Sequence, residues 1–179
     1  MSACDIILNS VDGVTVTLPA AIAWKEIGLL RSLAELDEGN QAEMPPIHLD
    51  FPAYVVKGIA TYLLNPDRRS EEIPKPLTIP LKSCVKKWEM EFIKEMESYG
   101  FLMPLLECSC YLRVQALQSL LSAYLAQCIQ EVAMSAPSIM EGAEHVRQLL
   151  RIENEWTRDE MVHLEKEMRY AKEIDPNVY

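Results

Sequence analysis

Short runs of apolar and polar residues open the chain and predict a small β-sheet. Ile6-Ile7-Leu8 is followed by Asp12-Gly13 and then by residues 14–18, in which apolar and polar positions alternate. Asp-Gly between two strand-like runs is typical of a β-hairpin, because a tight hairpin turn needs a residue that tolerates positive φ. Residues 47–49 predict one further short strand.

Helical spacing of apolar residues dominates the rest of the chain. It predicts one helix over 20–36, a second from Pro52 to Leu64, and helices from Val85 almost to the end. Residues 37–46 predict an acidic surface loop, and residues 66–80 contain four prolines, which favours a linker or a long loop.

The clearest amphipathic helix places its apolar residues three, four, seven, eight, eleven and twelve positions after the first. These residues are Leu117, Leu120, Leu121, Tyr124, Leu125, Cys128 and Ile129. A polar stretch over 135–138 separates it from a helix that contains Val146 and Leu150. Thr157-Arg158-Asp159-Glu160 has the form of a capping box and predicts that a last helix starts at Thr157. That helix has a thin apolar stripe, for which the pattern leaves both an internal core and an interaction surface open.

Composition narrows the possible partners. The formal net charge of -10 argues against a nucleic-acid partner, since such proteins normally present a basic face to phosphates. No apolar run reaches the ~20 residues of a membrane span, so we expect no membrane partner. The odd number of cysteines and the lack of a secretory signal at Met1–Asp5 favour free thiols in the cytoplasm or nucleus.

Motifs for catalysis or metal binding are weak. Glu160 and His163 form a single Glu-x-x-His, and Cys108-Ser109-Cys110 is spaced too closely for a typical zinc site. The sequence contains no phosphate-binding glycine loop and no Gly-x-Ser-x-Gly motif. We therefore expect no enzyme activity, no catalytic residue, no metal or other cofactor, and no small-molecule substrate.

The order of several segments resembles a known family. Trp88-Glu89-Met90-Glu91-Phe92-Ile93-Lys94 is similar to its motif Trp-Asp-x-Glu-Phe-Leu-Lys, and Tyr111-Leu112 with Val114 to its Tyr-Leu-Asp-Ile. Val146-Arg147, Ile152 and Asn154-x-Trp156-Thr157 resemble a run that precedes its glutamate-rich final helix. On these residues, and on the opening hairpin, the chain resembles the S-phase kinase-associated protein 1 family, the BTB/POZ-related adaptors of SCF cullin–F-box ubiquitin ligases.

The resemblance implies an α+β fold and an adaptor function. Residues 1–112 would form a BTB/POZ-like domain of a small sheet with helices, and residues 113–179 a helical extension that binds F-box proteins. Cys110 and Tyr111 would contact a cullin. The F-box-binding residues that the resemblance implies are Leu117, Leu121, Tyr124, Leu125, Val146, Leu150, Trp156, Leu164 and Tyr170.

The chain also departs from the family at several positions. Cys110 stands where the family usually has asparagine, Tyr170 replaces a tryptophan, and residues are inserted between Gln130 and Val146. These departures leave two alternatives to a ligase adaptor. One is an F-box-binding structural subunit of a non-ligase complex, for example in chromosome attachment or trafficking, and the other is a BTB-type oligomeric scaffold.

Overall fold

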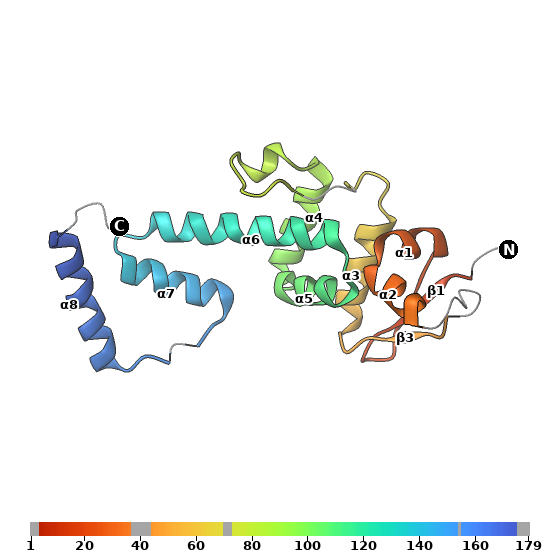
Figure 1. Cartoon of the computed structure of the whole chain (residues 1–179), viewed down its shortest axis with the longest axis horizontal. Coiled ribbons are helices and arrows are strands. Elements are labelled where there is room, and N and C mark those ends of the chain that lie inside the picture. The colour runs from red at the N-terminus through yellow and green to blue at the C-terminus, as the bar shows by residue number, and fades with distance from the viewer. Residues whose placement is uncertain (1–3, 37–43, 70–72, 154, 175–179) are drawn as a thin grey trace. The chain divides into compact units, whose positions relative to one another are not determined.

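The protein is a mixed α and β protein, as the sequence predicts, and most of it is helical. The computed structural model describes residues 4–36, 44–69, 73–153 and 155–174 (Figure 1). In these residues a three-stranded sheet accompanies eight α-helices. The chain divides into two compact units, residues 1–124 (unit 1) and 125–179 (unit 2). Most of the predicted acidic loop, residues 37–43, lies outside the described residues.

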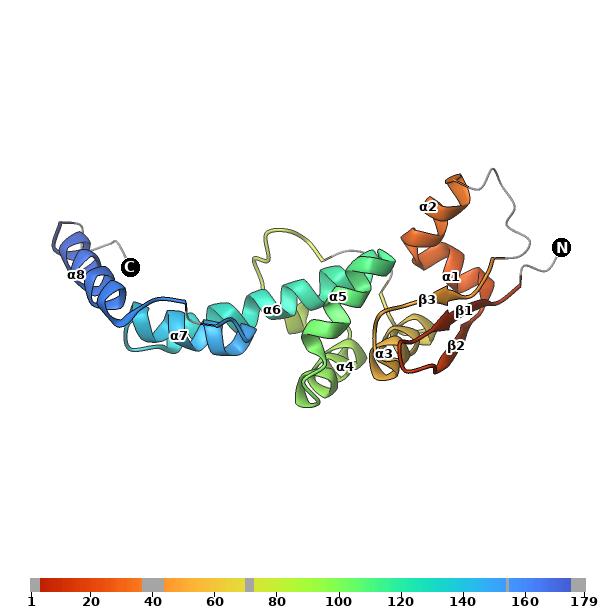
Figure 2. The same ribbon diagram turned by 90° about the horizontal axis from the view of Figure 1, so that it is seen from below.

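The predicted hairpin is confirmed. Strand β1 (Ile6–Asn9) pairs antiparallel with β2 (Thr15–Leu18), and the turn between them contains Gly13 with φ of 77°. The third strand, β3 (Ile47–His48), pairs parallel with β1 and completes the order β2-β1-β3 (Figure 2). The small sheet thus has β1 as its central strand.

The helix predicted over 20–36 is wrong as a single element, because it is two helices. Helix α1 (Ala20–Glu26) ends at Ile27, whose backbone is extended with φ -94° and ψ 101°, and α2 (Gly28–Leu36) follows. The break allows the Ile27 side chain to be completely buried. It also lets the Gly28 N–H donate to the Arg113 carbonyl at 3.2 Å. These tertiary contacts override the continuous apolar pattern.

Helix α3 (Ala53–Leu64) is the central helix of unit 1. Most of its apolar side chains are buried, and it packs against β2, α1 and α5. Its first turn is fixed by Asp12, whose carboxylate accepts a hydrogen bond from the Ala53 N–H at 2.8 Å. The hairpin turn therefore caps the helix that covers the sheet.

The loop after α3 is held by a buried carboxylate. Glu89 is completely buried in α4 (Lys87–Ser98) and accepts hydrogen bonds from the Tyr62 hydroxyl at 3.3 Å and from the Arg69 N–H at 3.0 Å. Its other oxygen accepts from the Lys86 N–H at 3.0 Å, which caps α4. A short 3-10 helix, η1 (Leu81–Ser83), lies within the segment between α3 and α4.

Three further helices complete the chain. Gly100 has φ of 72° and precedes α5 (Leu102–Leu112), which has Pro104 in its first turn. Helix α6 (Gln115–Ser135) is followed by α7 (Ile139–Leu150) and α8 (Arg158–Ile174). In unit 2, α7 returns beside the second half of α6 (Figures 1 and 2). A Cβ on Gly142 would lie 3.4 Å from the Ala133 carbonyl oxygen, so α7 packs against the end of α6 at this position.

Candidate functional site

Three of the residues assigned to F-box binding belong to the core of unit 1. Leu117 and Leu121 on α6 have no exposed surface, and Tyr124 is 8% exposed. The Tyr124 hydroxyl donates to a Glu97 carboxylate oxygen at 2.6 Å. The structure therefore places these side chains where they support the first part of α6 and leaves them little surface for a partner.

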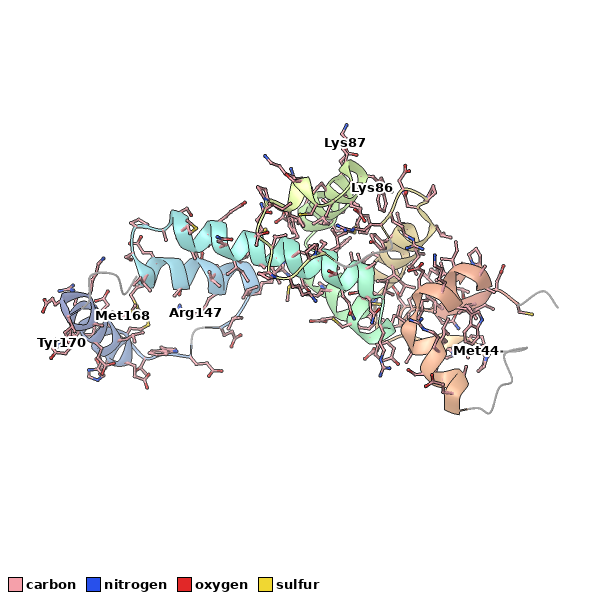
Figure 3. The ribbon with its side chains drawn as sticks, turned by 45° about the horizontal axis from the view of Figure 1, so that its top comes forward. Met44, Lys86, Lys87, Arg147, Met168 and Tyr170 are labelled. Carbon is pink, nitrogen blue, oxygen red and sulfur yellow. The ribbon has the colours of Figure 1, made fainter. Side chains whose placement is uncertain are left out.

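The other six assigned residues lie in unit 2 and have more exposed surface. Leu125, Val146, Leu150 and Leu164 are half-buried. Trp156 is 49% exposed and Tyr170 is 66% exposed. In Figure 3 the Tyr170 side chain extends from α8 away from α7, whereas Met168 lies on the side toward the turn between α6 and α7. Apolar and aromatic side chains are thus open to solvent on this unit.

Unit 2 has almost no buried interior. Among its described residues, 125–153 and 155–174, Gly142 alone is buried. In unit 1, by contrast, apolar side chains from β1, β2 and α1 to α6 are completely or almost completely buried. Full burial of a leucine-sized side chain contributes about 1.5–3 kcal/mol, and the half-buried side chains of unit 2 obtain only part of it. Its helices therefore have an apolar surface that they do not cover themselves.

A hollow opens at the turn between α6 and α7. It has a volume of about 720 Å³, and small and apolar side chains form most of its wall, with Arg147 and Lys172 beside them. A second hollow of about 250 Å³ adjoins it, between the start of α7 and α8, and shares Pro137, Ser138, Ile139 and Lys172 with the first. The sequence interpretation missed Pro137 and Ser138 because it assigned 135–138 to a polar connection, whereas Val146, which also lines the larger hollow, is among the assigned F-box-binding residues.

The start of α8 has the capping geometry that the sequence predicts. Thr157 donates its N–H and hydroxyl to Glu160 Oε2 at 2.8 and 2.7 Å, and the Glu160 N–H donates back to the hydroxyl at 3.3 Å. The hydrogen bond from the Thr157 N–H, with that from its hydroxyl, lowers the pKa of the Glu160 carboxyl. This confirmed capping box uses Glu160 to begin the helix, while His163 lies 3.3 Å from Glu167 on the exposed face.

The two residues assigned to cullin binding lie on α5 in unit 1. Cys110 is exposed, and Tyr111 is 51% exposed with its ring centroid 6.2 Å from that of Phe51. A second aromatic pair, Tyr54 and Phe101, stacks with centroids 3.9 Å apart, and Tyr54 is 41% exposed. Unit 1 therefore has exposed aromatic side chains at Tyr54 and Tyr111.

The possible metal ligands and the cysteines were the candidates for chemistry. No group of three or more His, Cys, Asp or Glu side chains is placed there to hold a metal ion. All five cysteines are free. Burial raises the pKa of the Cys108 thiol to about 12, so this thiol stays protonated near neutral pH. The described surface of unit 2, by contrast, exposes apolar side chains.

Comparison of the chain with known proteins does not assign it to a family. No protein-family model matches the chain, and no curated protein matches its sequence. No helix within the described residues is both long and apolar enough to cross a bilayer.

Proposed function

We propose that this protein is a non-enzymatic adaptor of an SCF-type ubiquitin ligase, which bridges a cullin and F-box substrate receptors. Residues 1–112 would be the BTB/POZ-like domain, and the helices of residues 113–179 would bind the F-box. The observation that carries the proposal is the uncovered apolar surface of unit 2. The ordered motif resemblance and the small sheet followed by helices give further support.

Energetics favour a partner helix over water on this surface. Four assigned side chains, Leu125, Val146, Leu150 and Leu164, are half-buried. Covering the exposed half of each contributes about 1 kcal/mol. Trp156 and Tyr170 supply the large aromatic area that often dominates binding energy at interfaces. A helical motif in a groove would cover all of these side chains.

The test uses the full chain and recombinant F-box domains, with affinity measured by fluorescence anisotropy. Tyr170→Ala and Trp156→Ala remove exposed side chains, so they change the surface without opening a cavity. Tyr99→Ala is the matched control, because Tyr99 is 59% exposed on unit 1. A Leu121→Asp variant is unsuitable, since Leu121 is completely buried and a charge there would disrupt the core.

We expect Tyr170→Ala and Trp156→Ala each to weaken F-box binding by about tenfold or more, and the control to bind like the native chain. The proposal is wrong if no F-box domain binds the native chain. It is also wrong if all three variants bind equally well.

A second candidate is an F-box-binding subunit of a complex without ligase activity. It is favoured by exposed Cys110, which stands where the resembled family has a polar asparagine. A cullin-binding assay distinguishes the two functions. The adaptor predicts that the native chain binds the N-terminal domain of a cullin and that Tyr111→Ala weakens this binding, whereas the non-ligase subunit predicts no binding by either protein.

A further inference from the structure

The two hollows of unit 2 lie partly in a segment that the resemblance does not cover, and partly against Val146, Arg147 and helix α8, which it does cover. Residues at the turn between α6 and α7, including Ala136, Ile139 and Ala143, line the larger hollow. They fall between Gln130 and Val146, where the chain is longer than the resembled family. Met134 beside them is 77% exposed and Ile139 is 42% exposed. The inserted residues therefore add an open apolar surface of their own.

Three basic side chains contribute to the walls of these hollows although the chain as a whole is strongly acidic. Arg147, Arg169 and Lys172 line them, and Glu165 is the one acidic side chain among the lining residues. Arg147 is paired with Glu144 at 3.1 Å. Within the part of the chain that the structure describes, no ion pair joins Lys172 or Arg169 to an acidic group. In a protein of net charge -10, this local positive surface favours an acidic partner group.

We propose that the hollows form a second anchor point that selects among F-box receptors. The occupant is an amphipathic helix of the receptor, which inserts apolar side chains into the larger hollow and places an Asp or Glu one turn away, against Lys172. This inference rests on the proposed function and specifies its partner. The lining suits such a helix because methionine adapts to differently shaped side chains and the basic rim rejects receptors with Lys or Arg at that turn.

The test takes an F-box domain that binds the native chain and measures its affinity for two pairs of variants. Ala143→Leu fills the larger hollow, and its matched control Ala126→Leu makes the same change at an exposed position of α6. Lys172→Glu reverses the charge at both hollows, and Lys166→Glu does so elsewhere on α8. Circular dichroism of each free variant establishes that its helices are intact.

We expect Ala143→Leu and Lys172→Glu to weaken binding by about tenfold or more, and both controls to stay within about twofold. An Asp or Glu to Lys change in the receptor helix should restore binding to Lys172→Glu. The salt dependence of binding should be smaller for Lys172→Glu than for the native chain.

The second anchor point and the adaptor function are contradicted by different results. If Trp156→Ala loses binding while the hollow variants bind like their controls, the second anchor is wrong and the adaptor function stands. If no F-box domain binds the native chain, both proposals are wrong. If light scattering shows a native dimer that Ala143→Leu dissociates, the hollow is occupied by a second copy of this chain and the receptor-selection proposal is overturned.

Discussion

The same leucine truncation should have very different costs in the two units. Leu117→Ala removes a side chain with no exposed surface, whereas Leu150→Ala removes one that is half-buried on α7. Truncation of a fully buried leucine costs about 2–5 kcal/mol, because burial is lost and a cavity remains. At Leu150 about half of the transfer free energy is at stake and no closed cavity forms, so the expected cost in the free protein is about 1 kcal/mol.

Native-state hydrogen exchange followed by mass spectrometry resolves the two units separately. Leu117→Ala should speed exchange throughout the buried helix α3, because we expect the core of unit 1 to open cooperatively. Leu150→Ala should leave α3 unchanged and produce a small effect within 139–150. In the native free protein, Met161 to Ala171 should exchange quickly, because none of the α8 residues is buried.

Binding of an F-box domain should make the Leu150 side chain energetically important. Once a partner covers Leu150, its truncation should lower affinity by about tenfold, which corresponds to about 1.4 kcal/mol. The reasoning would be refuted if Leu150→Ala destabilised the free protein as much as Leu117→Ala does. Strong protection of Met161 to Ala171 without a partner would refute it too, since both results would mean that unit 2 seals its own apolar surface.

Three further predictions concern unit 1. Glu89→Gln should lower the free energy of unfolding in urea by about 2–3 kcal/mol, because the amide replaces a buried carboxylate acceptor and turns an N–H toward other donors. Hydrogen bonds from Ser10 and from the Ala53 N–H lower the pKa of Asp12 below its ordinary value of 3.8. Ionised Asp12 therefore contributes its full stabilisation above pH 3.8, and this contribution is lost as the pH falls through the lower pKa of the folded protein. Asp12→Asn should therefore lower the melting temperature at pH 7, and its difference from the native protein should shrink in acid. Gly28→Ala should lower the free energy of unfolding by about 1–3 kcal/mol in the same urea assay, because the added Cβ would lie 2.9 Å from Arg113 Cβ. An unchanged urea midpoint would show that the α5–α6 turn moves freely.

Local interactions explain which elements the sequence predicted correctly. Asp12-Gly13 specified the hairpin because one glycine provides the positive φ of its turn. Thr157 and Glu160 specified the start of α8 because their side chains cap the same helical turn. Each of these features depends on residues a few positions apart, so the sequence by itself determined them.

Only the tertiary structure decided the features that depend on distant residues. The parallel pairing of Leu8 with Ile47, the break at Ile27 and the buried position of Glu89 each depend on partners far away in the chain. The same holds for the apolar stripes: periodicity defines one face of a helix but not what lies against it. Leu117 faces a core and Leu150 remains half-exposed, although both follow helical spacing, because burial depends on which other helices pack there.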